Sequence, residues 1–190
     1  MSVTLKAPFS LETLLQPYRN RRPAIMLLYE NMYREAHHLI VVQQLQRDFP
    51  ATELPDLADC LPGAETIILG LCTIGLALES RVAELFDPDP ASAVILDEIG
   101  TLWVNGLARQ MHLDIRTDSR ARGKQVSPAY RPGIGRWPVE LQGYIFYHLP
   151  AAEAGVSLLD GMLMVPQKSV SMIVAVGTKL GRNCYAPGGK

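Results

Sequence analysis

Cysteine is scarce in this sequence, and its placement excludes two kinds of site. The 190 residues include three cysteines, Cys60, Cys72 and Cys184, with no CxxC spacing among them. An odd number at these separations predicts ordinary reduced thiols rather than a disulfide framework or a zinc site. Cys72 follows an apolar run and is expected in the core. Cys184 is expected to be the more reactive thiol and to have no partner.

Long apolar runs and a charge excess are also absent. The formal net charge of −1 gives no support for nucleic acid or an acidic membrane surface as a partner. No apolar run reaches the roughly 18 residues that span a bilayer. Residues 1–6 contain no signal-peptide core, so we expect a cytoplasmic protein. With 48% hydrophobic residues, the chain fits a single domain over residues 1–190, or one domain with a small lobe.

The spacing of apolar and turn residues predicts an α+β fold. Helices are expected near residues 10–15, over 26–37, after a cap at Thr73, over 91–111, and from Pro138 to about 148. Strands are expected from 39–42 (or a continued helix there), over 66–72, and as a late antiparallel hairpin of 156–165 with 169–176. The remaining segments, 16–25, 50–62 and 114–137, are expected to be loops.

The helix over residues 91–111 has the most regular pattern in the chain. Five apolar side chains recur at intervals of four, from Ile95 to Met111. Gly100 and Gly106 interrupt it, and each costs roughly 1 kcal/mol relative to alanine in a helix. Such glycines indicate either tight packing against a neighbouring helix or the close approach of a ligand.

Residues 131–138, RPGIGRWP, form the most informative stretch for function. They end a predicted loop, residues 114–137, with six basic and two acidic residues, a net charge of +4. One interpretation is a solvated surface loop. The other is a site for a carboxylate or phosphate, held by arginine side chains and exposed backbone N–H groups. Trp137 could stack on a flat ligand or cover the core.

No catalytic or metal-binding constellation is evident. His37 and His38 are neighbours on a predicted helix and point in different directions, which argues against metal ligation. Asp97 and Glu98 are also adjacent, a spacing unsuited to a pair of catalytic carboxylates and better explained by capping and solvation. Without a Ser/His/Asp arrangement or a P-loop, we predict a binding module with no catalytic or metal-binding residues.

Four blocks of sequence, in order, resemble the activation domain of vitamin B12-dependent methionine synthase, particularly its small stand-alone relatives. The resemblance covers residues 64–177, whereas residues 1–60 diverge. The blocks are residues 71–75 (LCTIG) with Glu79, 95–101 (ILDEIGT), 132–142 (PGIGRWPVELQ), and 154–159 (AGVSLL) leading to 164–171 (MVPQKSVS).

The resemblance implies a twisted antiparallel sheet with flanking helices that binds S-adenosylmethionine. In that family the domain presents the ligand's methyl group to a corrinoid in the inactive Co(II) state, and an electron from a reductase completes the reactivation. The protein positions ligands whose own chemistry does the work. Cobalamin would reach this chain only through a partner, a corrinoid protein or corrinoid methyltransferase, and a homodimer is a further possibility.

The same resemblance implies a set of ligand-binding residues in the glycine loop and the long helix. Gly133 and Gly135 would let the backbone approach the ligand, and Trp137 would wall the pocket. Three family positions differ in this sequence: an arginine is replaced by Ala129, a tyrosine by Ile134, and a glutamate by Asn105.

Where the family has its arginine, this sequence has Ala129. In this hypothesis Arg131, two residues later, or Arg136 takes over the role of that arginine. Either would hold the carboxylate of S-adenosylmethionine. Asn105 would contact polar groups of the ligand, because an amide hydrogen-bonds but supplies no charge.

Three hypotheses follow from the sequence. The first is a stand-alone protein that supports reductive reactivation of a corrinoid-dependent methyltransferase by binding S-adenosylmethionine. The second is a non-catalytic adaptor of the same fold that no longer binds S-adenosylmethionine and docks on a corrinoid protein or another copy of itself. In the third, the loop holds another small anion, such as a folate or a phosphate.

Overall fold

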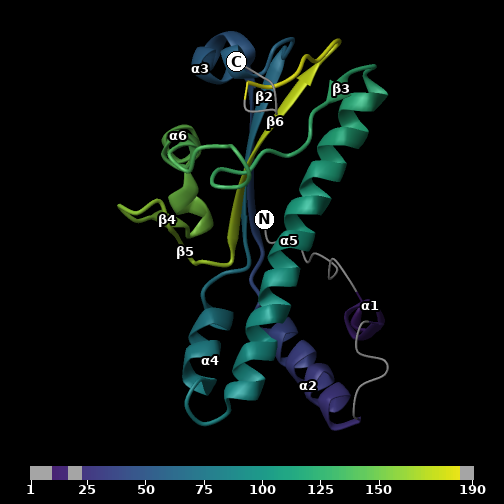
Figure 1. Ribbon diagram of the computed structural model, residues 1–190, viewed down its shortest axis with the longest axis vertical. Helices are drawn as coiled ribbons and strands as arrows, with labels where there is room; N and C mark the ends of the chain where they lie inside the picture. Colours follow the sequence, from purple (N-terminus) through teal and green to yellow (C-terminus); the bar gives the residue numbers. More distant parts are fainter. Residues whose placement is uncertain (1–9, 17–22, 185–190) are drawn as a thin grey trace.

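The computed structural model describes residues 10–16 and 23–184 (Figure 1). The helices are α1 (Leu11–Leu15), α2 (Pro23–Leu39), α3 (Pro55–Cys60), α4 (Ala77–Leu85), α5 (Pro90–Ala121) and α6 (Leu141–His148), with 3-10 turns η2 (Ala51–Glu53) and η3 (Ala151–Ala154). The strands are β1 (Gln43–Pro50), β2 (Thr66–Thr73), β3 (Gln125–Val126), β4 (Ser157–Leu158), β5 (Met164–Val165) and β6 (Ser169–Gly177). The predicted α+β class is confirmed.

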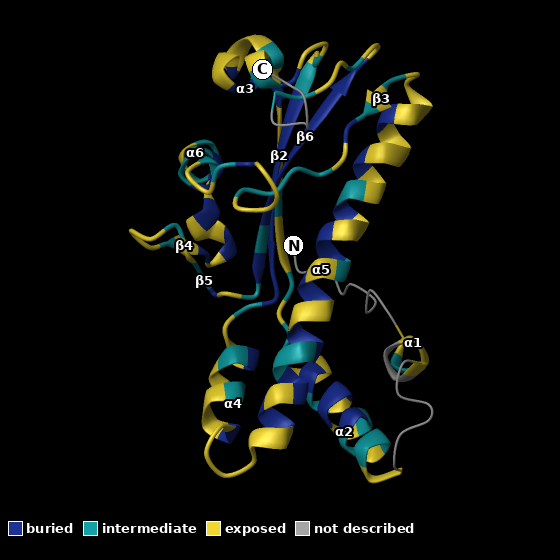
Figure 2. Ribbon diagram, viewed as in Figure 1, coloured by how far each residue is buried: buried dark blue, intermediate teal, exposed yellow. Residues whose placement is uncertain are grey.

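A four-stranded antiparallel sheet, in the order β1-β2-β6-β3, forms the centre of the fold. The two middle strands are buried along almost their whole length (Figure 2). Alternate side chains of a strand point to opposite faces. Ile68 and Cys72 therefore join one hydrophobic cluster, whereas Ile67 and Leu69 join another. The predicted burial of Cys72 is confirmed, and burial raises the pKa of its thiol to about 12.

Helix α5 covers one face of the sheet and extends past its end (Figure 1). Its 32 residues span about 48 Å, whereas strands of eight or nine residues span about 30 Å. The overhanging half of α5 is covered by α2 and α4. A Cβ at Gly100 would lie 2.7 Å from Leu78 Cδ2 of α4. Tight helix packing is thus the structural reason for this glycine.

The other face of the sheet is covered by α3, α6 and η3. Their buried side chains, among them Leu57, Ile145 and Ala151, pack on the odd-numbered residues of β2 and on Ile173 and Ala175 of β6. The sheet therefore lies between two hydrophobic clusters, one on each face.

The prediction of a loop over residues 114–137 was wrong for its first third. Helix α5 continues to Ala121 because Ile115 and Ser119 extend the buried stripe by two more turns after Met111. The helix ends where Gly123 adopts a positive φ of 70°. The basic residues of this segment lie on the exposed side of the helix, where charge does not oppose helix formation.

The predicted hairpin of residues 156–165 with 169–176 was also wrong. The first segment folds on itself, as the small hairpin β4–β5. The second segment, β6, pairs with β2 in the main sheet, from Thr73 opposite Ser169 to Thr66 opposite Val176. A fully buried strand can pair with any strand of suitable length, so proximity in sequence did not identify the partner.

Several predicted boundaries differ in detail. Helix α2 runs to Leu39, and the strand that follows begins at Gln43, after the apolar residues assigned to it. Residues 50–62 contain η2 and α3 rather than irregular chain only. Thr73 ends β2 and does not cap α4, because that helix begins at Ala77 with Leu76 as its N-cap. The Thr73 hydroxyl accepts from the Gly75 N–H at 3.2 Å. The first turn of α6 begins at Leu141, three residues after Pro138.

The predicted helix at residues 10–15 is confirmed as α1, with Ser10 as its N-cap. The loop expected before Pro23, which contains three arginines, and the N-terminal residues 1–6 lie outside the described residues.

The prediction that all three cysteines are reduced and unpaired was wrong. Cys60, at the end of α3, forms a disulfide with Cys184, 124 residues away in the sequence. Spacing rules detect cysteines close together in the chain, whereas this pair meets only after residues 178–184 return to α3. The third cysteine, Cys72, is a free thiol.

Candidate functional site

An open cleft lies between the middle of α5 and the segment that leads from β3 to α6. Its volume is about 550 Å³, within the range of small-molecule sites in proteins. It is lined by Asn105, Ala108, Arg109, His112, Ala129, Tyr130, Arg131, Ile134 and Trp137.

One face of α5 supplies four of these residues. Asn105, Ala108, Arg109 and His112 are spaced by three or four, so they lie side by side on the helix. Ala108 is buried and forms the floor, whereas Arg109 is exposed. The His112 Nε2 lies 2.8 Å from the Ser127 carbonyl oxygen. His112 Nε2 is therefore the donor in this pair and ties α5 to the opposite wall.

The opposite wall is held in place by β6. The Ser127 N–H donates to the Ala175 carbonyl at 2.9 Å, and Tyr130 exchanges both of its backbone hydrogen bonds with Ile173. The chain then leaves the sheet in a turn in which the Gly133 N–H donates to the Trp137 carbonyl at 2.9 Å. The positive φ values of Gly133 and Gly135, 79° and 65°, are what this turn requires.

Arg131 is oriented by a side chain of α5. Its Nη1 donates to Asn105 Oδ1 at 2.7 Å, and the Asn105 Nδ2 donates in turn to the Thr101 carbonyl at 2.8 Å. The amide thus has both ends engaged and fixes the guanidinium at the cleft. A guanidinium has five N–H donors, so this bond leaves others for an anion.

Two stacked aromatic rings form the inner end of the cleft. Tyr130 and Trp137 have ring centroids 4.3 Å apart and an interplanar angle of 19°. Trp137 is only 8% exposed and belongs to the hydrophobic cluster beneath α6. Trp137 covers the core, as one of the two sequence interpretations expected. It also lines the cleft, where the other interpretation would have it stack on a ligand.

The charges around the cleft are of one sign. Arg109 and Arg131 contribute guanidinium groups, and the described lining contains no carboxylate. It also contains no serine, cysteine or lysine that could act as a nucleophile. The arrangement can bind an anionic group beside an aromatic and apolar surface.

The structure brings together four of the six residues predicted for the site. Asn105, Arg131, Ile134 and Trp137 line one cleft. Gly133 and Gly135 form the turn between them and are not part of its lining. Arg136, the alternative arginine, is exposed and also lies outside the lining.

The sequence interpretation missed Arg109, His112 and Tyr130. The two helical residues could have been found from Asn105, because positions four and seven further along a helix share its face. Tyr130 had no such signal, since its place depends on the pairing with β6.

A second, smaller hollow of about 220 Å³ lies across the loop from the cleft. Arg131 and Ile134 line both hollows. Its other walls combine apolar side chains, among them Val139, Met162 and Met164, with polar ones. Two of the polar residues are joined by a buried hydrogen bond from Ser171 Oγ to Gln142 Oε1 at 3.0 Å. The side chain of Ile134 is 65% exposed, so it does not plug the cleft.

Residues from the other sequence blocks that resemble the family meet at Lys168. Its Nζ lies 2.7 Å from Asp97 Oδ1 and donates to Thr101 Oγ1 at 2.9 Å, while its backbone N–H donates to Glu79. Its carbonyl accepts from the Ile74 N–H at 3.2 Å. Asp97 therefore anchors the link between β5 and β6, a structural role that the capping interpretation missed.

Neither metal binding nor a membrane-spanning helix is supported by the described part of the chain. Within residues 10–16 and 23–184, no group of three or more histidine, cysteine, aspartate or glutamate side chains could hold a metal ion. Among the same residues, no helix is both long and apolar enough to cross a membrane.

Comparison with known proteins finds a likeness to solved structures. No protein-family model matches the sequence, and no curated protein matches it. The crystal structure of the MetH reactivation domain bound to AdoHcy superposes with a TM-score of 0.59 at 13% sequence identity. The match covers 92% of this chain and 70% of that one. The chain therefore has the fold of the MetH reactivation domain.

Proposed function

We propose that this protein binds S-adenosylmethionine in the cleft between α5 and residues 129–137. The observation that carries the proposal is Arg131, whose guanidinium is fixed by Asn105 at 2.7 Å beside an open cleft. Among the described residues that line this cleft there is no carboxylate. Support comes from the likeness to a domain that was crystallised with AdoHcy, which has the same amino-acid carboxylate and adenosine.

The residues present fit the parts of such a ligand. Arg131, with Arg109 nearby, would hold the carboxylate through charge-assisted hydrogen bonds. Tyr130 and Trp137 would offer an aromatic edge to the adenine. Asn105 would act on the ligand through Arg131, because its own amide is engaged by Arg131 and Thr101.

The proposed role is that of a stand-alone, cytoplasmic accessory protein that supports reductive reactivation of a corrinoid-dependent methyltransferase. S-adenosylmethionine would supply the methyl group, and the corrinoid would belong to the partner. The residues that line the cleft would bind and orient the sulfonium ligand. The methyl transfer itself would depend on the chemistry of the ligand and the corrinoid.

A surface next to the cleft is suited to such a partner. Leu159 and Leu163 of the β4–β5 hairpin are 51% and 64% exposed. Met162 and Met164 of the same hairpin share the smaller hollow with Ile134. Exposed apolar groups gathered in one place are typical of an interaction site. We expect the corrinoid protein to dock here, beside the loop that holds the ligand.

Calorimetric titration with S-adenosylmethionine and AdoHcy tests the ligand assignment. We expect Arg131→Ala to weaken binding roughly tenfold to hundredfold, the usual cost of hydrogen bonds to a charged group. Arg136→Ala is the matched control, since it removes an exposed guanidinium from the same loop but outside the cleft. The absence of heat at millimolar ligand would reject the assignment.

The adaptor hypothesis is separated from this one by a pull-down with cobalamin-loaded corrinoid protein. The differences at Ala129, Ile134 and Asn105 favour the adaptor, because they remove ligand groups of the family. An adaptor should bind the corrinoid protein without S-adenosylmethionine and give no heat in the titration. Tighter binding of phosphate or folate than of S-adenosylmethionine would favour the third hypothesis.

A further inference from the structure

The segment of residues 178–184, which follows β6, is fixed at both ends. At its beginning, the Thr178 N–H donates to Glu65 Oε1 at 2.7 Å. At its end, Cys184 is joined to Cys60 by the disulfide, and the Cys184 N–H donates to the Cys60 carbonyl at 3.0 Å. Between them, the Gly181 N–H donates to the Pro62 carbonyl at 2.7 Å.

Apart from the disulfide, the described contacts of this segment include hydrogen bonds of exposed residues and the packing of Leu180. Thr178, Lys179 and Gly181 are exposed, and Leu180 is the side chain that packs on the hydrophobic core. Water competes for hydrogen bonds of this kind, so segments held by them open readily. The covalent link keeps the segment at a high effective concentration beside α3.

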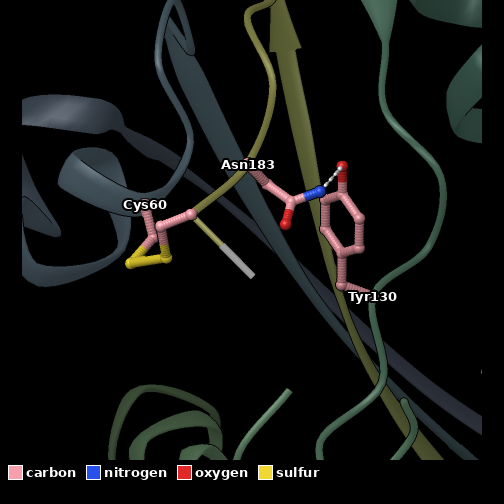
Figure 3. The surroundings of a disulfide bond; sticks show 4 residues. Cys60, Tyr130 and Asn183 are labelled. Carbon is pink, nitrogen blue, oxygen red and sulfur yellow. Dashed lines mark hydrogen bonds between the residues drawn. A yellow bond between two sulfur atoms is a disulfide. The ribbon is translucent and has the colours of Figure 1, made fainter. Parts of the chain in front are cut away.

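The segment touches the wall of the cleft through Asn183. Its side-chain Nδ2 donates to the Tyr130 hydroxyl at 3.2 Å, one residue before the disulfide (Figure 3). The ring of Tyr130 stacks on Trp137, and both rings line the cleft. One chain of contacts therefore leads from the sulfur atoms to the candidate ligand site.

We propose that the Cys60–Cys184 pair is a thiol switch that controls the cleft. In the oxidised state the disulfide holds Asn183 against Tyr130, and the Tyr130–Trp137 stack is fixed. Reduction frees residues 178–184 from α3, removes this hydrogen bond and loosens the aromatic wall. The consequence for ligand affinity rests on the proposed function, whereas the change in the wall does not.

The chemistry requires a dithiol reductant. A thiolate of the reductant attacks one sulfur of the pair and forms a mixed disulfide, and the other cysteine leaves as a thiolate that takes up a proton. The second thiol of the reductant then attacks the mixed disulfide and frees the remaining cysteine. Two electrons and two protons pass to Cys60 and Cys184, and the reductant leaves as a disulfide. Both cysteines are half-buried, so a small dithiol can reach them.

The first test counts thiols. Protein purified without reductant and then denatured should show one reactive thiol, from Cys72, and protein treated with dithiothreitol should show three. Three thiols without reductant would overturn the proposal, because no disulfide would then exist to be switched.

The second test follows Trp137 directly. In a Trp103→Phe background, Trp137 is the one remaining tryptophan, and its emission should move to longer wavelength on reduction. Asn183→Ala should produce the same shift in the oxidised protein, whereas Lys179→Ala, an exposed position of the same segment, should not. Unchanged emission on reduction would overturn the proposal.

The third test measures binding of S-adenosylmethionine in both thiol states. Reduction should weaken it roughly twofold to tenfold, the effect of losing one hydrogen bond in the wall. A Cys60→Ser, Cys184→Ser double variant should behave like the reduced protein and ignore dithiothreitol. Equal affinity in both states would overturn the switch and leave the proposed function standing. Absence of binding in both states would refute the proposed function, and the emission of Trp137 would still decide the switch.

Discussion

Replacing Asn105 with alanine tests how Arg131 is held at the cleft. The substitution removes the acceptor that lies 2.7 Å from Arg131 Nη1. A hydrogen bond to a charged group contributes about 1.5–3 kcal/mol. Because Asn105 is exposed, solvent reduces this to about 1 kcal/mol. If the oriented guanidinium binds the ligand carboxylate, Asn105→Ala should therefore weaken S-adenosylmethionine binding about fivefold.

Folding stability should change little in the same variant. Alanine is the better helix former by roughly 0.5 kcal/mol, which offsets the loss of exposed hydrogen bonds to Arg131 and Thr101. Calorimetric titration gives the affinity, and thermal unfolding without ligand gives the stability. Affinity should fall while the melting temperature stays close to that of the wild type.

Gln110→Ala provides the control for this prediction. Gln110 is another exposed amide on α5, its Nε2 donates to Asp114 at 2.8 Å, and it lies outside the cleft. Its removal should leave the affinity unchanged. Wild-type affinity in Asn105→Ala would show that Arg131 needs no support from α5. Equal losses in both variants would show a general effect on the helix rather than one on Arg131.

Two further predictions concern stability. Gly100→Ala should destabilise the fold by roughly 1–2 kcal/mol in urea unfolding, because the overlap with Leu78 outweighs the gain in helix propensity. At Gly143 an added Cβ would have its nearest contacts at 3.7 Å, so Gly143→Ala should stabilise the fold by up to about 1 kcal/mol. If both variants changed the free energy of unfolding in the same direction, the packing argument would be contradicted. Hydrogen bonds from the Lys124 side chain and from the hydroxyl and N–H of Thr178 lower the pKa of Glu65 from 4.5 to about 2. Its carboxylate therefore favours the folded state above pH 4.5, and this contribution is lost as pH falls through about 2. The stability difference between wild type and Glu65→Gln should therefore shrink over that range in acid unfolding, and a constant difference would contradict the assignment.

The sequence was a good guide to those parts of the fold that depend on local spacing. The four-residue repeat from Ile95 to Met111 predicted the core of α5, and the apolar run at residues 66–72 predicted β2. The end of α5 was not predicted, because its last turns bury a few residues under a largely charged surface. Pairing was not predictable either, since β6 could have joined β5 or β2 on composition alone.

The site, too, was predictable only where local sequence determines it. Arg131 and Trp137 were identified from a loop in which glycine, arginine and tryptophan occur together. The bond between Arg131 and Asn105 joins residues 26 positions apart and depends on how the loop lies on the helix. The disulfide, across 124 positions, depends on the return of the chain to α3. Such long-range contacts leave no periodic signal in a single sequence.

A crystal structure with AdoHcy present in excess would show directly whether and where this protein binds the ligand. We expect the ligand in the cleft between α5 and residues 129–137, with its carboxylate within hydrogen-bonding distance of Arg131. An empty cleft at saturating ligand, or a ligand whose carboxylate lies away from both Arg131 and Arg109, would contradict it.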